Sequence, residues 1–378
     1  MTGLRIAVVG LAGIGQAHLH ACGMADSILT AVCDSDARAL AAAAEAHHVP
    51  SFASYEELVA SGVCDAVVIA TPPFLHVEQV SAALAAGLHV YCEKPLAPTA
   101  RQCRQLAEAA DTAGRRLAVG FQHRFQRSHL AVNALLAAGE LGPVHRVSMT
   151  GTNWFRPDSY FTSSPWRARW RTAGGGTLLS TAIHQLDALV SFVGLPTRVT
   201  GRAFRALHRT VEVEDDAMAL LEYESGARGT VVASSVDPAG VDRLEIHGDR
   251  GSLVAEGFRL NRASFPEAIS AVSATSVDPF EVIDVAWDEI VSTGGPRESF
   301  NLIVDSHRDF ADAVASDRAP INHGTEASQT IELVNAIYLS SVRGATVELP
   351  LDLDAFDDAY DKLCSGRLSL PTRPGSPS

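Results

Sequence analysis

Residues 8–18, VVGLAGIGQAH, join an apolar run to a glycine-rich turn, a combination that can bind a dinucleotide. In G-x-G-x-x-G turns the glycines let backbone N–H groups approach a pyrophosphate at the start of a helix. Alanine replaces the second glycine here, although the next residue is again glycine and adds room. The candidate cofactor contacts in the turn are Gly10, Ala12, Gly13, Ile14 and Gly15.

Asp34 lies 19 residues beyond Gly15, at the end of the next apolar run. A carboxylate in this position accepts hydrogen bonds from adenosine ribose hydroxyls and repels a 2′-phosphate. The sequence therefore predicts NAD as the cofactor in preference to NADP. The alternative is a strand–helix turn that binds nothing. The presence of the strand, the helix and the carboxylate of Asp34 together argues against it.

Glu93–Lys94–Pro95 ends another apolar run, 89–95. Open α/β sheets bind ligands at the carboxyl ends of their strands. A lysine placed there, partly desolvated and near a nicotinamide cation, can exchange a proton with a substrate hydroxyl. Lys94 is therefore the candidate acid/base, and a lone surface lysine is the alternative.

A second glycine run precedes Ser180, His184 and Asp187 in residues 174–189. It could hold a phosphate, act as a hinge, or lead into reactive side chains. We expect the three polar residues to share one face of a single helix, because they are spaced four and three apart. Leu179, Ile183, Leu186 and Val190 would form the neighbouring apolar stripe that seats this helix in the core.

The first 122 residues alternate short apolar runs with helical patterns, which predicts βαβ units and a doubly wound parallel sheet. After Gln122 the pattern changes to period-2 alternation with turn signals, which predicts an α+β domain with antiparallel strands. Expected strands lie at 4–10, 28–34, 65–71, 89–95, 116–121, 145–152, 197–204, 216–224, 229–236 and 243–248, with late helices near 299–316 and 325–341.

The length, net charge and cysteine content of the chain argue against several classes of protein. A chain of 378 residues predicts two domains, and a net charge of -14 argues against nucleic acid or an anionic membrane as partner. Six cysteines without CxxC spacing suggest neither a zinc site nor a disulfide framework, so we expect a reducing cytoplasm and no metal. No stretch approaches the ~18 to 20 apolar residues that a membrane span needs.

The chain resembles the Gfo/Idh/MocA oxidoreductases, the family of glucose–fructose oxidoreductase and inositol dehydrogenase. The resemblance runs through the dinucleotide turn, VCDSD, ATPPFLH, YCEKPLA, GFQHRF and GGGTLLSTAIHQLD to the late helices, and so covers nearly the whole chain. It implies a Rossmann domain, here 1–122, and a second domain, 123–368, whose open sheet mediates oligomers. Residues 369–378 are expected to form a disordered tail.

The resemblance also implies roles for particular residues. Lys94 matches the usual catalytic acid/base and His184 the active-site histidine, while Ser180 departs from the aspartate that many relatives carry. Serine holds no charge, so we expect Ser180 to hydrogen-bond a hydroxyl and substrate choice to shift. Further cofactor contacts are implied for Thr71, Pro72, His76, Glu93, Gln122, Trp166 and Arg167.

Residues 153–170 mix aromatic rings with arginine, a composition that suits a substrate or cofactor lid because sugars pack their C–H groups on rings. A packed surface loop is the alternative. A short basic run at 123–127 can meet a phosphate or simply solvate a loop. The substrate-binding candidates are Ser180, Arg124, Trp154, Tyr160 and Asp187.

The leading hypothesis is an NAD-dependent dehydrogenase acting on a secondary alcohol of a sugar, sugar derivative or cyclitol. Lys94, assisted by His184, would take the hydroxyl proton. One alternative is a redox-neutral sugar or glycoside conversion with tightly held NAD, and another is a non-catalytic NAD sensor. The expected partners are a small-molecule substrate and further copies of the chain, as a homodimer or homotetramer.

Overall fold

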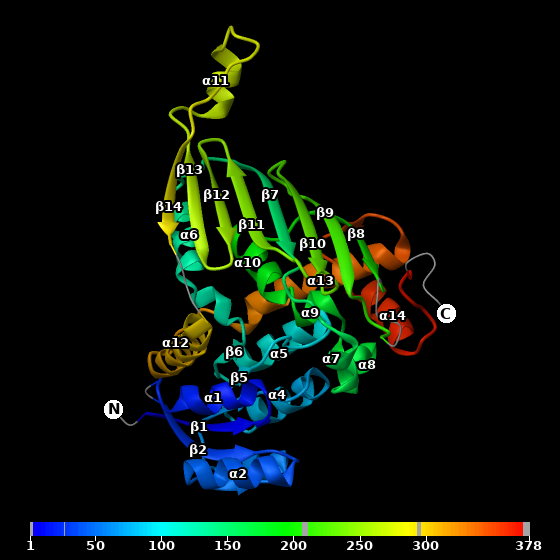
Figure 1. Ribbon diagram of the computed structural model, residues 1–378. Helices are drawn as coiled ribbons and strands as arrows, with labels where there is room; N and C mark the ends of the chain where they lie inside the picture. The colour runs from blue at the N-terminus through cyan, green and yellow to red at the C-terminus, as the bar shows by residue number, and fades with distance from the viewer. Residues whose placement is uncertain (1–2, 26, 206–210, 293–295, 373–378) are drawn as a thin grey trace. The chain divides into compact units, whose positions relative to one another are not determined.

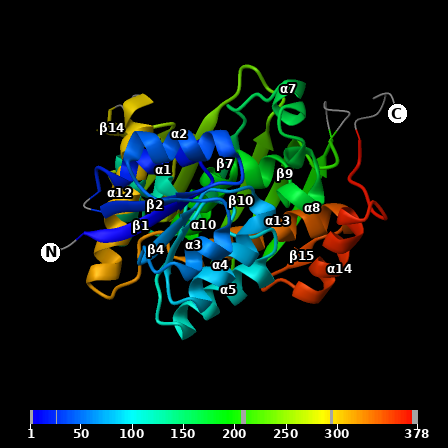
Figure 2. The ribbon, with the colours of Figure 1, turned by 90° about the horizontal axis from the view of Figure 1, so that it is seen from below.

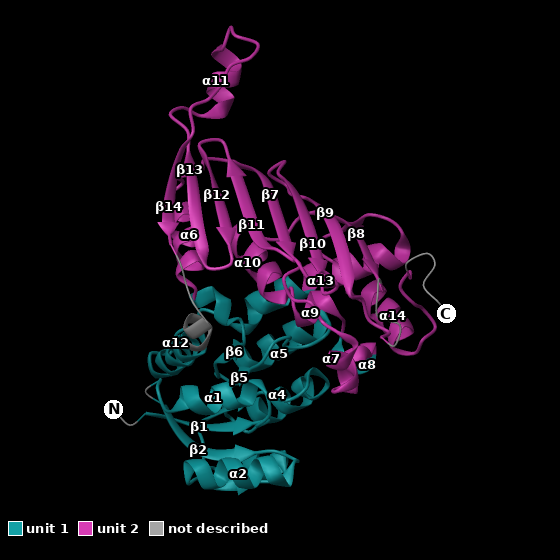
Figure 3. Cartoon of the chain, viewed as in Figure 1, with its two compact units in different colours: residues 1–125, 171–174, 296–331 teal, residues 126–170, 175–295, 332–378 magenta. Residues whose placement is uncertain are grey.

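The computed structural model describes residues 3–25, 27–205, 211–292 and 296–372 (Figure 1). Contacts divide the chain into two compact units (Figure 3). Unit 1 comprises residues 1–125, 171–174 and 296–331, and unit 2 comprises residues 126–170, 175–295 and 332–378.

Unit 1 contains a six-stranded sheet of order β3-β2-β1-β4-β5-β6 in which every paired strand is parallel. Its strands are nearly continuous apolar runs because helices cover both faces (Figure 2). The strands are β1 (Leu4–Val9), β2 (Ser27–Cys33), β3 (Ser51–Phe52), β4 (Ala66–Ile69), β5 (His89–Cys92) and β6 (Leu117–Val119).

Three helices of unit 1, α2, α3 and α5, begin at polar caps. Asp36, Ser54 and Thr99 each accept hydrogen bonds from backbone N–H groups of the first turn that they precede. The helices between strands are α1 (Ile14–Cys22), α2 (Ala37–His47), α3 (Tyr55–Ala60), α4 (His76–Ala85) and α5 (Ala100–Thr112).

One late helix, α12 (Pro296–Ala315), also belongs to unit 1. Ile303 and Val304 pack with Ala21 and Ala25 at the end of α1, and Phe310 enters the main core of the unit. This grouping differs from the boundary expected at Gln122, which assigned α12 to the second domain. The difference arises because apolar residues late in the chain return to cover the first helix.

Unit 2 is built on a nine-stranded sheet of order β14-β13-β12-β11-β7-β10-β9-β8-β15, mostly antiparallel, with one parallel pair between β7 and β10. The expected fold class is therefore confirmed in both units. The strands are β7 (Val144–Gly151), β8 (Arg198–Phe204), β9 (Asp216–Glu222), β10 (Arg228–Ser234), β11 (Asp242–Gly248), β12 (Gly251–Glu256), β13 (Arg259–Ser264), β14 (Ala286–Val291) and β15 (Val347–Glu348).

Helices cover one face of this sheet. Contacts join α10 to β7 and α6 to β13 and β14, and Ser340 of α13 accepts a hydrogen bond from Gly201 N of β8. The helices of this part of the chain are α6 (Arg127–Ala137), α7 (Asp158–Thr162), α8 (Trp170–Ala173), α9 (Thr177–Ser180), α10 (Ile183–Val193), α11 (Ile269–Thr275), α13 (Gly324–Arg343) and α14 (Leu353–Cys364).

The opposite face of the sheet is open and partly apolar. Met218 and Leu220 of β9 are 49% and 60% exposed, and Val232 of β10 lies on the same face. Val147 and Met149 of β7 follow the same period-2 pattern but are not exposed. Both are buried, and a Cβ on Gly151 of the same strand would lie 3.2 Å from Met149 Cε and 3.6 Å from Gln185 of α10.

Residues 369–372, expected to belong to a disordered tail, are ordered parts of unit 2. Leu370 is buried and Pro371 O accepts a hydrogen bond from Arg205 N, so residues 369–372 are held by unit 2. The rest of the expected tail, 373–378, lies outside the described residues. In the ranges that the structure describes, no helix has the length and apolar character that crossing a membrane requires.

We expect Phe310→Ala to lower the free energy of unfolding by about 3–5 kcal/mol, because the ring is fully buried against Tyr91 in the core of unit 1. Chemical denaturation of the purified protein measures this loss. The control Phe280→Ala removes a ring that is 84% exposed and should change stability by less than about 0.5 kcal/mol. Equal stabilities for the two variants would contradict the placement of α12 in this core.

Candidate active site

The glycine turn after β1 is closed by backbone contacts that exclude larger residues. Gly10 has a φ of +85°, and a Cβ there would lie 2.8 Å from the carbonyl group of Ala70. A Cβ on Gly15 would lie 2.0 Å from Gly10 O. At Gly13, by contrast, no atom of the described residues comes within 4 Å of the Cβ position. The turn thus leaves open space at the N-terminus of α1, which fits a pyrophosphate.

Asp34 follows β2 and is already tied to the turn. Its Oδ2 accepts a hydrogen bond from Leu11 N at 2.7 Å, and its Oδ1 accepts one from Asp36 N at 2.8 Å. A carboxylate has about four acceptor positions, so capacity for further donors remains. Ala12 O accepts a hydrogen bond from Gly15 N at 3.0 Å, and Ile14 begins α1 with its side chain partly exposed.

The loop after β4 carries Thr71, Pro72 and His76. Thr71 Oγ1 donates to Gln79 Oε1 at 2.6 Å, and Pro72 directly precedes the 3₁₀ turn Pro73–Leu75. His76 is buried, with its ring nitrogens 2.8 Å from Thr71 O and 2.8 Å from the carbonyl oxygen of Pro95. His76 therefore joins this loop to the segment after β5, and we correct its role from direct cofactor contact to positioning of these loops.

Glu93 is buried at the end of β5, with Lys94 half-buried beside it. Its Oε1 lies 3.0 Å from His18 Nε2, and its Oε2 accepts a hydrogen bond from Lys94 N at 3.2 Å. Burial alone would raise the pKa of Glu93, but the hydrogen bond from His18, together with the charge and backbone N–H of Lys94, lowers it. A Cβ on Gly120 would lie 2.7 Å from this carboxylate, so glycine at that position makes room for it.

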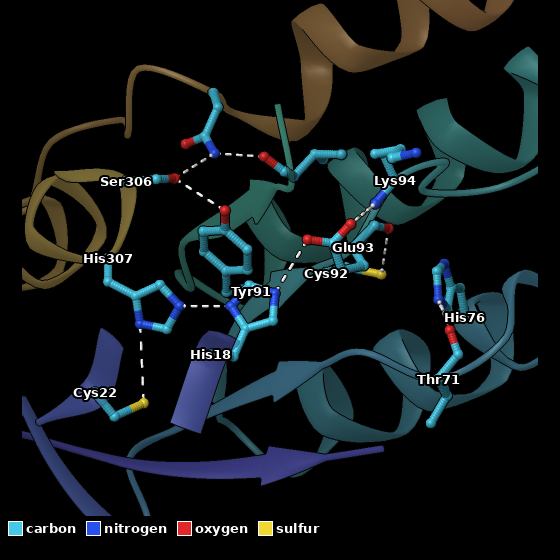
Figure 4. A network of polar contacts seen from close by, with 12 residues as sticks. His18, Cys22, Thr71, His76, Tyr91, Cys92, Glu93, Lys94, Ser306 and His307 are labelled. Atoms are coloured by element: carbon cyan, nitrogen blue, oxygen red, sulfur yellow. Dashed lines mark hydrogen bonds and ion pairs between the residues drawn. The ribbon is translucent and has the colours of Figure 1, made fainter. Parts of the chain in front are cut away.

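Lys94 thus has an ionised carboxylate on one side. Burial and the charge of Lys94 also lower the pKa of His123 to about 4, which keeps that imidazole neutral near neutral pH. The peptide bond between Lys94 and Pro95 is cis. The structure therefore places a cationic side chain beside one anion and one neutral ring (Figure 4 shows Lys94 and Glu93).

Gln122 and Arg124 lie in the 3₁₀ turn Gln122–Phe125. Among the described residues, Gln122 Oε1 is a buried acceptor without a hydrogen-bond partner, an arrangement that is costly unless a ligand or water supplies a donor. Arg124 is a correction to the sequence prediction. Its guanidinium is buried, pairs with Glu326 and donates to Ile321 O at 3.1 Å, so its charge is used within unit 1 in place of substrate contact.

The glycine run before α9 is packed against a buried acid. Gly176 N and Leu178 N each donate to the carboxylate of Glu214 at 2.9 Å, and Tyr338 OH donates to it at 2.7 Å. A Cβ on Gly176 would lie 1.7 Å from Glu214 O, and one on Gly175 would lie 2.3 Å from Tyr338 OH. At these two positions glycine is required because the close neighbours are the protein's own side chains and backbone.

Ser180, His184 and Asp187 do not share one continuous helix, contrary to the expectation. Ser180 ends α9, whereas His184 and Asp187 belong to α10, and Ala182 N donates to Thr177 O five residues back. The helix is interrupted where the segment anchored on Glu214 ends. His184 and Asp187 are buried in α10, and the expected apolar stripe of Leu179, Ile183, Leu186 and Val190 is also buried, as predicted.

Residues 153–170 form an alternating stack of rings and guanidinium groups. Arg156 lies over the rings of Trp154 and Tyr160, at 5.2 and 4.8 Å from their centroids. Arg167 lies over the rings of Tyr160 and Trp166, at 4.4 and 5.1 Å. Tyr160 therefore stands between two cations. Cation–π contacts hold the predicted lid segment in a defined shape, while its contact with a ligand stays a prediction.

Sequence reasoning missed the partners of these groups. His18 lies in the first helix, in phase with buried Leu19 and Cys22, and a polar residue among apolar ones was the available signal. Nothing in the local sequence marks His307, Glu214 or Tyr338, because their partners lie between 36 and 289 residues away along the chain.

Comparison with known proteins places these observations in a wider context. A model of an oxidoreductase family with an NAD-binding Rossmann fold matches residues 4–121, and the GFO/IDH/MocA C-terminal domain matches residues 129–254. A D-xylose 1-dehydrogenase (NADP(+)) of Haloferax volcanii is 31% identical over 92% of this chain and 100% of its own. An inositol 2-dehydrogenase of Rhizobium meliloti is 28% identical over 68% of this chain and 76% of its own.

Solved structures agree with these matches. The WlbA dehydrogenase of Bordetella pertussis, crystallised with NADH and UDP-GlcNAcA, superposes with a TM-score of 0.78. The match is 28% identical in sequence and covers 93% of this chain and 100% of that one.

The Glu214 contacts predict a pH-dependent stability. Burial raises the pKa of Glu214 from its ordinary value of 4.5 to about 7, despite three hydrogen bonds that favour the ionised form. A raised carboxyl pKa contributes stability that is present below pH 4.5 and is lost as the pH rises through 7. We expect the free energy of unfolding to fall between pH 5 and 8 by on the order of 3 kcal/mol.

Glu214→Gln cannot ionise, so its stability should change much less over the same pH range. Urea denaturation at pH 5.5, 7 and 8 measures the free energy of unfolding of both proteins. The quantity compared is the slope of that free energy against pH. Parallel curves for Glu214→Gln and the wild type would show that Glu214 does not titrate in this range.

Proposed function

This chain belongs to the Gfo/Idh/MocA family of oxidoreductases, and from that membership we propose that it transfers a hydride between NAD and a sugar-like substrate. The substrate carries the reacting carbon as a secondary alcohol or ketone of a sugar, sugar derivative or cyclitol. Sugar and inositol dehydrogenases among the relatives support this class.

The observation that carries the proposal is the position of two segments at one edge of the unit 1 sheet. The glycine turn leaves the carboxyl end of β1, and Glu93–Lys94 leaves the carboxyl end of β5, with only β4 between them. Ligands of open parallel sheets bind at this edge. A cradle for a dinucleotide and a candidate acid/base thus belong to the same edge.

NAD, when bound, supplies the hydride acceptor. During oxidation the neutral amine form of Lys94 accepts the proton of the substrate hydroxyl and becomes an ammonium beside Glu93, and in the reverse direction the ammonium returns that proton. Its half-buried position beside Glu93 keeps it oriented, and His184 assists by hydrogen bonding the substrate. Ser180 donates or accepts one hydrogen bond to a hydroxyl, a role that requires no charge.

The stack of Trp154, Arg156, Tyr160, Arg167 and Trp166 is the proposed contact surface for sugar and cofactor. Rings present flat apolar faces to sugar C–H groups, and guanidinium groups donate hydrogen bonds to hydroxyl or carboxylate oxygens. Because the rings and cations already contact each other, little side-chain entropy is lost when a ligand binds.

A screen distinguishes the proposed dehydrogenase from its two alternatives. The purified protein, supplied with NAD and a panel of sugars and cyclitols, should form NADH, detected by its absorbance, with at least one polyol. Nucleotide that copurifies and is not exchanged would favour a redox-neutral conversion with retained NAD. Nucleotide binding without turnover of any compound would favour an NAD sensor and contradict the proposed dehydrogenase.

We also propose that the open face of the unit 2 sheet is covered by another copy of the chain. Met218, Leu220 and Val232 form its apolar centre, and exposed apolar surface on a sheet marks an interface. Closed symmetric assemblies are the common result, so a homodimer or homotetramer is expected.

Lys94→Ala should lower turnover by roughly 10² to 10⁴, because the proton acceptor is lost, while NAD affinity changes little. Lys94→Arg should be nearly as defective, because a guanidinium does not release its proton near neutral pH. Steady-state kinetics with the best substrate of the panel and a titration of NAD binding measure the two effects. Full turnover in Lys94→Ala would remove Lys94 from the mechanism.

NAD should bind at least roughly tenfold more tightly than NADP, because the carboxylate of Asp34 repels a 2′-phosphate. The double variant Asp34→Ser/Ser35→Arg should narrow or reverse this ratio, since serine can still accept from Leu11 N and arginine attracts the phosphate. Ser35→Arg alone is the matched control. A wild-type protein that prefers NADP, as the Haloferax relative's name indicates for that enzyme, would refute the assignment.

A further inference from the structure

A buried chain of polar side chains lies behind the Glu93–Lys94 segment, entirely within unit 1 (Figure 4). We call it the Glu93 network and define it as Cys22, His307, His18 and Glu93. Cys22 and His18 are one turn apart on α1, His307 comes from α12, and Glu93 follows β5. Three segments far apart in the sequence therefore meet at one carboxylate.

The contacts follow one another in a single series. Cys22 Sγ lies 3.9 Å from His307 Nδ1, and His307 Nε2 lies 2.8 Å from His18 Nδ1. His18 Nε2 lies 3.0 Å from Glu93 Oε1, and Glu93 Oε2 accepts from Lys94 N. The series thus ends on the backbone of the proposed acid/base.

Burial limits how protons are placed in this series. His18, His307 and Cys22 have no exposed surface, and Glu93 has only 6%. Two imidazole nitrogens 2.8 Å apart need one proton between them, because two lone pairs repel and two N–H groups clash. The ring nitrogen that faces an ionised carboxylate must carry a proton, so His18 Nε2 is a donor.

With neutral rings, one arrangement satisfies every contact. His18 carries its proton on Nε2, so its Nδ1 accepts from His307 Nε2–H, and His307 Nδ1 faces the thiol of Cys22. The S–H of Cys22, the N–H of His307 and the N–H of His18 then each donate to the next group in the direction of Glu93.

The electrostatic environment agrees with this arrangement. Burial and the proximity of His18 lower the pKa of His307 well below its ordinary value, which keeps the ring neutral. Burial raises the pKa of Cys22 to about 12, which keeps the thiol protonated. The pKa of Glu93 is lowered, as described above, which keeps the carboxylate charged.

A second set of contacts holds the rings and α12 in place. The centroid of the Tyr91 ring lies 5.4 Å from that of the His18 ring and 5.1 Å from that of the His307 ring. The Tyr91 hydroxyl is 2.9 Å from Ser306 Oγ, which accepts a hydrogen bond from Asn322 Nδ2 at 3.1 Å. Neither histidine ring can turn over without breaking contacts with its neighbours.

We propose that His307, acting through His18, is a positioning residue for the Lys94 acid/base: it fixes the donor that keeps Glu93 ionised and aligned with Lys94. The kinetic consequences of this proposal rest on the proposed function. The proton positions in the Glu93 network do not depend on it. The ionised carboxylate stabilises the ammonium form of Lys94 and holds the backbone on which that side chain is carried.

The charged and titratable groups around this carboxylate come from several elements. Those that interact with Glu93 or Lys94 are His18 from α1, His76 from α4, Tyr91 and Cys92 from β5, and His123 from the turn after β6. His18 and Lys94 are the groups that lower the pKa of Glu93. The direct test of the network is therefore to remove the contact between His307 and His18.

The kinetic test compares His307→Leu, His307→Gln, Glu93→Gln and the control His20→Gln, which alters an exposed histidine of α1, the helix that carries His18. His307→Leu should lower kcat roughly tenfold and move the limb of the pH–rate profile that reports Lys94 to lower pH. Glu93→Gln should move it further in the same direction. His307→Gln, whose amide can donate to His18, should restore most of both properties, and His20→Gln should resemble the wild type.

Loss of activity in His307→Leu and His307→Gln alike, with an unchanged pH–rate profile, would reduce His307 to a structural residue and overturn the proposal. Circular dichroism of each variant checks that it is folded. If both histidine variants fail to fold, the Glu93→Gln profile and the spectra described next still decide.

A test without substrate uses protein with ¹⁵N-labelled histidine. We expect the spectra of His18 and His307, assigned from single variants, to show each ring protonated on Nε2 at pH 7. An imidazolium on His307 at pH 7, or a proton on His18 Nδ1, would overturn the proposal. This result is independent of turnover, so a wild type that oxidises no sugar would contradict the proposed function and leave the network to be judged by its spectra.

Discussion

The buried, ionised carboxylate of Glu93 is the interaction on which the candidate site in unit 1 depends. A charge inside a protein is costly unless hydrogen bonds and an opposite charge compensate it. His18 supplies the hydrogen bond from the first helix, Lys94 supplies charge and a backbone N–H, and Gly120 leaves the space. These requirements connect the helix that follows the dinucleotide turn with the segment that carries the proposed acid/base.

Unit 2 contains a buried carboxylate with the opposite behaviour. Glu214 is bound by two backbone N–H groups and the hydroxyl of Tyr338, all neutral donors, and burial raises its pKa to about 7. Glu93 has a lysine beside it and an imidazole in contact, and its pKa is lowered. In Glu93 the hydrogen bond of an imidazole and the nearby charge of Lys94 offset burial, whereas the backbone and hydroxyl donors of Glu214 do not.

Both acids act on the chain segments from which function is expected. Glu93 holds the start of the Lys94 segment, and Glu214 holds the glycine run that leads to Ser180. A rigid support of this kind keeps a reactive side chain in one orientation, and so reduces the entropy lost on reaching the transition state. The family to which the chain belongs supplies the type of reaction, while these supports belong to the packing seen here.

The sequence by itself determined the fold class, the dinucleotide turn, most strands of unit 1 and the apolar stripe of α10, because these depend on local periodicity and on glycines with special geometry. It did not reveal that α12 returns to unit 1, that α9 and α10 are separate, or that Arg124 pairs with Glu326. Nor did it reveal the partners of Glu93 and Glu214. Only the tertiary structure decided these features, because a buried charge is satisfied by whichever groups the fold brings within 3 Å, however distant they are along the chain.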